Sequence, residues 1–198
     1  MAIKVDKEKK RRDIADACTE LLLQKGLKNL TITEIAKTAG IGKGTVYDYF
    51  SNKEELVFEI IRKFIEEHHN NLLSQSDSHT STKQKILYLF DFFLSEYKNY
   101  EKHLDVYREY LSVTMSSKCS KMLEFNRECA GFISNILENI IEEGIAKGEI
   151  KDISRGLTDG LIKTERGYMV AAWAEGRDLK LEFKQYIDTL FELIEIKK

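Results

Sequence analysis

The sequence predicts an all-α fold of about nine helices, and three observations support this prediction. The 198 residues include no proline and only 11 glycines. Apolar residues make up 42% of the chain and charged residues 32%, which suits amphipathic helices joined by short turns. No long stretch alternates cleanly between apolar and polar residues with a period of two, so strands are not expected.

Residues 31–50 contain the most informative pattern, two short helices joined by a turn. An earlier helix is expected over about residues 8–25. Thr31 and Glu34 have the spacing of a capping box, in which the hydroxyl accepts from a backbone N–H and the carboxylate reaches back. Gly40 lies where the end of a helix needs a residue that tolerates positive φ. The pattern therefore indicates a short helix, a tight turn and a second short helix.

The second short helix is expected to bury one set of side chains and to leave another set on its outer face. Those expected to pack inward are Ile41, Val46, Tyr49 and Phe50. Lys43, Thr45 and Tyr47 are left to point elsewhere, and they carry a cation and two hydroxyls. Such a pair of helices is typical of a helix-turn-helix. Helices this short are not stable alone, so their neighbours must hold them.

This stretch resembles the tetracycline-repressor (TetR) family of bacterial transcription regulators. The matching positions run in order along the first third of the chain: Ile14, Ala17, Leu21, Leu22, Gly26, Thr31, Ile35, Ala36, Ala39, Gly40, Gly44, Thr45, Val46, Tyr47, Tyr49, Phe50, Lys53, Glu54, Glu55 and Leu56. The resemblance implies a DNA-binding head over residues 8–67, with the helix-turn-helix at about 31–50. It also implies an effector-binding and dimerisation domain over residues 68–198.

The resemblance further implies which residues meet DNA. The positions expected to face the duplex are Lys43, Gly44, Thr45, Tyr47 and Tyr49, and those expected to contact its backbone are Thr31, Thr33 and Lys53. Hydroxyls and a lysine suit phosphates or base edges, and a glycine without Cβ lets the start of a helix approach the duplex closely. The competing interpretation is a hairpin that only packs, with Tyr47 half-buried.

Six longer helices are expected after the helix-turn-helix. The first begins at Asn52 or Lys53 and runs toward His69, before a polar loop at residues 74–82. The other five are expected over about residues 82–100, 102–115 and 118–147, from about residue 154, and over about 180–196.

Aromatic side chains are dense between residues 82 and 147, and two interpretations are open. They form either a plain core or the lining of a cavity with few polar groups, which would suit a lipophilic small-molecule effector. The residues assigned to such a pocket are Phe93, Tyr97, Tyr107, Tyr110, Phe125, Asn126, Cys129 and Tyr168. The family resemblance favours a pocket without identifying its residues.

Small residues recur on one stripe of the helix expected from about residue 154. Gly156, Gly160, Gly167 and Ala171 would let another backbone approach closely. Together with the last helix they form the predicted homodimer interface, because both stripes would otherwise be exposed. The residues expected to contribute from the last helix are Phe183, Ile187, Leu190 and Phe191.

Enzymes, metalloproteins and membrane proteins are not favoured by the sequence, and no cofactor is expected. No paired catalytic constellation is present. The lone E-x-x-H pair, Glu66 and His69, is expected to be a solvated helix end, since di-iron bundles need two such pairs. The longest apolar runs are too short to span a membrane. Three cysteines without metal-binding spacing indicate reduced thiols and a cytoplasmic location.

The predicted function is sequence-specific DNA binding by a homodimer that represses transcription until an effector binds. Two-fold symmetry implies a pseudo-palindromic operator in double-stranded DNA. The alternative is a ligand-binding or protein-interaction bundle whose head no longer binds DNA. The first 50 residues carry a net charge of +3 and the remainder −5. The basic cluster at residues 4–12 either follows phosphates or is a frayed, solvated terminus.

Overall fold

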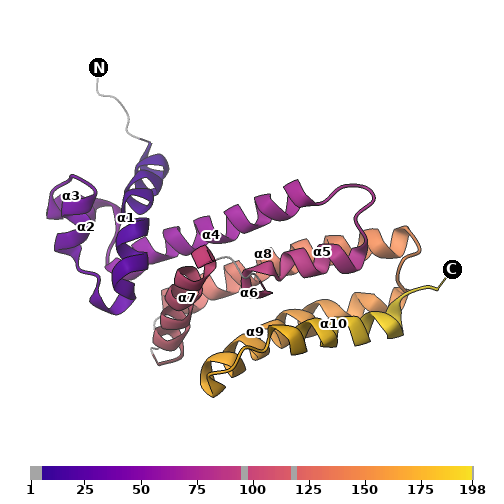
Figure 1. Ribbon diagram of the computed structural model, residues 1–198. Helices are drawn as coiled ribbons and strands as arrows, with labels where there is room; N and C mark the ends of the chain where they lie inside the picture. The colour runs from indigo at the N-terminus through magenta and orange to yellow at the C-terminus, as the bar shows by residue number, and fades with distance from the viewer. Residues whose placement is uncertain (1–5, 95–97, 117–119, 198) are drawn as a thin grey trace. The chain divides into compact units, whose positions relative to one another are not determined.

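The computed structural model describes residues 6–94, 98–116 and 120–197 (Figure 1). Its helices are α1 (Lys7–Asn29), α2 (Ile32–Thr38), α3 (Lys43–Tyr49), α4 (Lys53–Gln75), α5 (Thr82–Leu89), α6 (Asp91–Leu94), α7 (Lys98–Ser116), α8 (Ser120–Ala146), the 3-10 segment η1 (Asp152–Leu157), α9 (Thr158–Glu175) and α10 (Lys180–Ile194). Within these ranges there is no β-strand, only an isolated bridge between Ile150 and Glu195. The all-α prediction is confirmed.

The described residues form two compact units. The first comprises the described parts of Met1–Glu67 and Tyr97–Phe125, and the second those of His68–Glu96 and Asn126–Lys198. Because of this division, α4 and α8 each contribute residues to both units. Within the first unit α7 packs against α1, although its residues fall in the predicted effector-binding domain. The functional division between residues 67 and 68 stays a prediction.

Two of the predicted helices are interrupted. The helix expected over about residues 82–100 breaks at Phe90, whose backbone (φ −93°, ψ 8°) leaves helical geometry. Phe90 is only 3% exposed, and its ring packs edge-on against that of Phe183, with 5.6 Å between the ring centroids. The helix expected from about residue 154 begins as η1 and becomes α-helical at Thr158.

The end of α1 is a junction between α1 and α7. Gly26 has φ 73° and ψ 166°, which interrupts the helix one turn before its last residue. The next backbone N–H, that of Leu27, donates a hydrogen bond to Glu109 of α7. The carboxylate of Glu109 occupies the space beside Gly26, where a Cβ would lie 2.6 Å from its Oε2 atom. The junction therefore needs both the conformational freedom and the small size of glycine.

Replacing Gly26 with alanine should destabilise the protein by about 1–3 kcal/mol, because this region of φ and ψ is almost restricted to glycine. Crowding of Glu109 adds to that cost. The matched control is Gly131→Ala in α8, where nothing lies within 4 Å of a built Cβ. That substitution should stabilise α8 by up to about 1 kcal/mol through helix propensity. Chemical unfolding measures both variants, and a Gly26→Ala protein as stable as the wild type would contradict the junction.

Candidate functional site

The helix-turn-helix begins with the predicted capping box. The hydroxyl of Thr31 accepts from the N–H of Glu34 at 3.3 Å, and the Glu34 carboxylate accepts from the N–H of Thr31 at 3.2 Å. A hydrogen bond from Lys25, with a smaller contribution from Thr31, lowers the pKa of Glu34, so the carboxylate is charged at neutral pH. The turn uses Gly40 at φ 65°. Both local predictions are confirmed.

α3 buries one face and presents the other to solvent. Val46 and the capping residue Phe50 are fully buried, whereas Tyr47 is 58% exposed. Lys43 and Gly44 are exposed as well, and Thr45 and Tyr49 are half-buried. Nothing lies within 4 Å of a Cβ built on Gly44. An outward Tyr47 does not fit a hairpin that only packs, because that interpretation required it to be half-buried.

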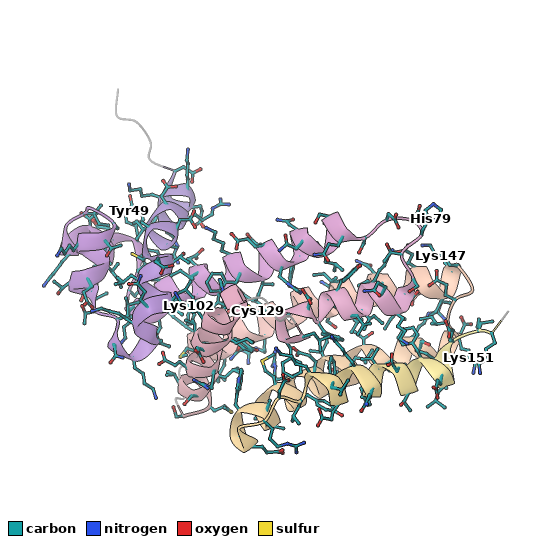
Figure 2. All side chains as sticks on the ribbon, viewed as in Figure 1. Tyr49, His79, Lys102, Cys129, Lys147 and Lys151 are labelled. Carbon is teal, nitrogen blue, oxygen red and sulfur yellow. The ribbon has the colours of Figure 1, made fainter. Side chains whose placement is uncertain are left out.

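Arg11 fixes the end of α3. Its guanidinium donates to the carbonyl of Tyr49, the last residue of α3, and pairs with Glu59 of α4 at 3.0 Å (Figure 2 labels Tyr49). It also lies over the ring of Phe50, 4.5 Å from the ring centroid. One side chain of α1 thus holds α3 and α4 together. Sequence reasoning missed this role, because Arg11 carried no signal beyond its place in a basic cluster.

The side chain of Lys53 caps the C-terminal end of α1. Its ammonium donates to the carbonyls of Leu27, Lys28 and Leu30, at 2.9, 3.0 and 3.1 Å. These contacts use all three of its hydrogens and satisfy carbonyl groups that the helix end leaves without partners. Of the other two residues predicted to contact the DNA backbone, Thr33 is exposed and Thr31 serves the capping box. Contacts of these residues with DNA stay predictions.

A family model described as bacterial regulatory proteins, tetR family, matches residues 14–60. That segment contains the capping box, the turn and the exposed face of α3. The protein is a TetR-family transcriptional regulator.

Individual relatives agree with this assignment. This TetR-family regulator is 27% identical over 153 residues to the fatty acid metabolism regulator protein of Bacillus subtilis, covering 74% of this chain and 73% of the relative. It is 36% identical over 61 residues to the transcriptional repressor KstR2 of Rhodococcus jostii, covering 31% and 30%. A TetR transcription regulator from Haloarcula marismortui shares the fold, with a TM-score of 0.74 at 18% identity over 96% of this chain and all of that one.

These relatives are regulators rather than enzymes, and the TetR-family protein described here is a DNA-binding transcriptional regulator. Regulators of this family bind DNA as dimers. No helix in the described ranges is long and apolar enough to cross a membrane. The same ranges contain no group of three or more His, Cys, Asp and Glu side chains that could hold a metal ion.

Three of the predicted effector residues lie in the first unit of the TetR-family regulator, Tyr110 and Phe125 in its core and Tyr107 half-buried beside them. Tyr110 and Phe125 are 1% and 4% exposed. The ring of Phe58 stacks on Phe125, with 4.6 Å between centroids, and meets Tyr110 edge-on at 6.0 Å. Tyr107 stacks on Tyr110 at 6.4 Å. The burial and ring contacts of Tyr110 and Phe125 are typical of a core, and the assignment of these three residues to a pocket stays a prediction.

The remaining predicted effector residues lie in the second unit. Phe93 and Tyr168 pack against Phe183, with centroid distances of 5.9 and 5.3 Å. Asn126 and Cys129 are half-buried on α8 (Figure 2 labels Cys129). Tyr97 lies outside the described residues. The eight predicted residues are therefore divided between two compact units, and an effector pocket built from them stays a prediction.

The predicted dimer residues fall into two groups. Phe183, Ile187 and Phe191 of α10 are 0%, 0% and 3% exposed. They belong to the core of their own unit and leave little surface for a partner, so their place in a dimer interface stays a prediction. Leu190 and Ala171 are half-buried. Gly160 and Gly167 of α9 are exposed, as is Gly156, which lies in η1, and nothing lies within 4 Å of a Cβ built on any of the three.

Replacing Tyr47 with alanine should abolish specific operator binding and leave stability within about 0.5 kcal/mol of the wild type, because the side chain is exposed. Fluorescence anisotropy with an operator duplex and thermal unfolding measure the two effects. Asp48→Ala is the matched control on the same helix. It should retain or improve binding, because a carboxylate near phosphates is unfavourable. Equal operator affinity of Tyr47→Ala and wild type would remove Tyr47 from the interface.

Replacing Lys53 with alanine should destabilise the protein without DNA by about 1.5–3 kcal/mol, the range for hydrogen bonds to charged groups. The carbonyls of Leu27, Lys28 and Leu30 lose their partner in this variant. If Lys53 also contacts a phosphate, the salt slope of DNA binding should fall by about 0.9. Unchanged stability would contradict the capping role, and an unchanged slope would contradict the phosphate contact.

Proposed function

We propose that this regulator is a homodimeric repressor that binds a pseudo-palindromic operator and releases it when a lipophilic effector binds the second unit. The supporting observation is the outward face of α3 on a helix that Arg11 and Phe50 hold in place. A fixed helix with exposed hydroxyls and a lysine suits the major groove. We also infer a cytoplasmic location, where operator DNA would be found.

The proposed dimer uses the open stripe of α9. Gly160 and Gly167 of α9 are exposed, and nothing lies within 4 Å of a Cβ built on either residue. A partner helix would approach closely there, because glycine leaves the backbone uncovered. A two-fold dimer that binds a pseudo-palindromic operator presents two copies of α3 to successive major grooves, roughly 34–36 Å apart.

The proposed effector is lipophilic. The Bacillus subtilis relative is named a fatty acid metabolism regulator, and the similarity to it extends well beyond the head. A molecule that prefers the DNA-incompetent state weakens operator binding, and the operator weakens its binding by the same factor. Release of the operator is therefore a population shift between two conformations of the dimer.

Gly160→Leu should convert the dimer to monomers, since overpacking of a close helix contact costs about 1–3 kcal/mol. Operator affinity should collapse with it, because one head makes too few contacts. Gly131→Leu in α8 is the matched control, as this exposed glycine also has open space around its Cβ. Sedimentation velocity and anisotropy test both variants. A dimeric Gly160→Leu protein with wild-type operator affinity would contradict the proposed interface.

The switch is tested by a thermal-shift screen of lipophilic and polar compounds, followed by operator competition with each hit. We expect hits among the lipophilic compounds, each of which lowers operator affinity. Hits confined to sugars and phosphates would contradict the lipophilic effector. Hits that stabilise the protein and leave operator affinity unchanged would contradict the switch.

A further inference from the structure

The second unit contains a groove between the end of α4 and α8. Its volume is about 490 Å³, within the usual range for small-molecule sites. One wall comes from the last turns of α4 and the residue after it, and the other from α8, with Lys85 of α5 at one end. The lining residues of the two walls are His69, Leu72, Leu73 and Ser76, and Phe132, Asn135, Ile136, Asn139, Ile140 and Glu143. We call it the α4–α8 groove. None of the seven predicted effector residues that the structure describes lines it.

The α8 wall of this groove carries two parallel rows of side chains. One row is apolar and repeats every four residues, at Phe132, Ile136 and Ile140. The other row is polar with the same spacing, at Asn135, Asn139 and Glu143. Residues four apart lie on one face of a helix, so each row runs the length of the groove. From Phe132 to Glu143 the rise is about 16 Å.

The α4 wall places unpaired polar atoms beside apolar surface. Leu72 is buried and Leu73 is 59% exposed. His69 Nδ1 and Ser76 Oγ are buried, and neither has a hydrogen-bond partner within the described part of the chain. The rings of His69 and Phe132 form a T-shaped pair across the groove, with 5.5 Å between centroids. Buried polar atoms are normally hydrogen-bonded, and both residues with an unpaired atom line the groove.

The end of the groove carries opposite charges that cancel. Lys85 is 9% exposed, and its ammonium lies 2.7 Å from each carboxylate oxygen of Glu143. Lys147, just past the end of α8 (Figure 2), also pairs with Glu143 at 2.7 Å. The charges of Lys147 and Lys85 act on Glu149 as well, so two ammonium groups face two carboxylates. Lys147 and then Lys85 lower the pKa of Glu143, so its carboxylate stays ionised at neutral pH. A charged group on a ligand would be attracted by one of these side chains and repelled by its neighbour, so it would gain little from binding here.

We propose that the α4–α8 groove binds an elongated, uncharged amphiphile. Its hydrocarbon part lies along Phe132, Ile136 and Ile140, and its hydroxyl or amide groups face the polar row and the unpaired atoms of the α4 wall. The apolar row supplies the area that binding buries, and the polar row selects a head that both donates and accepts hydrogen bonds. This inference rests on the proposed function, because it names the class of effector and the residues that bind it.

The test compares three ligands that share one hydrocarbon chain, dodecanol, dodecanoate and dodecylammonium, below their aggregation limits. Isothermal titration calorimetry of the full-length protein measures each affinity. We expect dodecanol to bind at least about tenfold more tightly than either charged compound, because an ion loses hydration without gaining a net opposite charge. Failure of all three to bind, or tighter binding of a charged head, would overturn the inference.

Variants of the ion pair give a sharper result. Glu143→Gln removes the carboxylate that pairs with both Lys85 and Lys147, which leaves a net positive charge, so dodecanoate should gain about tenfold relative to dodecanol. Glu142→Gln is the matched control, since Glu142 is exposed, neighbours Glu143 and pairs instead with Arg155. Ile136→Asp should weaken binding of all three ligands. Circular dichroism checks that each variant is folded. Equal effects of Glu142→Gln and Glu143→Gln would overturn the groove assignment.

Operator competition separates this inference from the proposed function. If the groove variants change ligand affinity as expected, but ligand binding leaves operator affinity unchanged, the groove assignment stands and the switch is wrong. If a ligand lowers operator affinity equally in wild type, Glu143→Gln and Ile136→Asp, the switch stands and the groove assignment is wrong.

Discussion

The junction at the end of α1 is the interaction on which the head depends. Gly26 turns the chain at a positive φ that other residues adopt only with strain. Glu109 then accepts a hydrogen bond from the next backbone N–H, and Lys53 donates to carbonyls at the end of the helix. One short segment thereby joins α1 to α4 and α7, three helices far apart in sequence. A charged partner on each side of a helix end satisfies groups that would otherwise be buried without hydrogen bonds.

The exposed face of α3 follows from that framework. A helix of seven residues has too few internal hydrogen bonds to be stable alone. Val46 and Phe50 anchor it through burial, and Arg11 holds its last carbonyl. The inner face of α3 packs into the core, so Tyr47 and Lys43 are exposed to solvent on its outer face. The rest of the first unit determines the position of that outer face. Rigid placement of a few outward side chains is what recognition of a DNA groove requires.

The features that sequence could predict are local, and those it could not predict depend on distant partners. The capping box of Thr31 and the turn at Gly40 involve residues within one helical turn, so residue type and spacing suffice. The bond between Leu27 and Glu109 joins residues 82 positions apart, and nothing local signals it. Apolar periodicity identified α10 as amphipathic, but it did not reveal that Phe183 is fully buried within its own unit. The α4–α8 groove was missed for the same reason, because a helical face does not reveal whether its neighbour fills the space beside it.

Sequence-specific DNA binding is the central claim, and selection of bound duplexes from a random pool by the purified protein tests it most directly. A dimer that presents two copies of α3 predicts an enriched inverted repeat with half-site centres about 10 base pairs apart. Its affinity should fall steeply with salt, as phosphate contacts require. A pool that shows no enriched sequence, with weak and salt-insensitive binding to every duplex, would contradict the account.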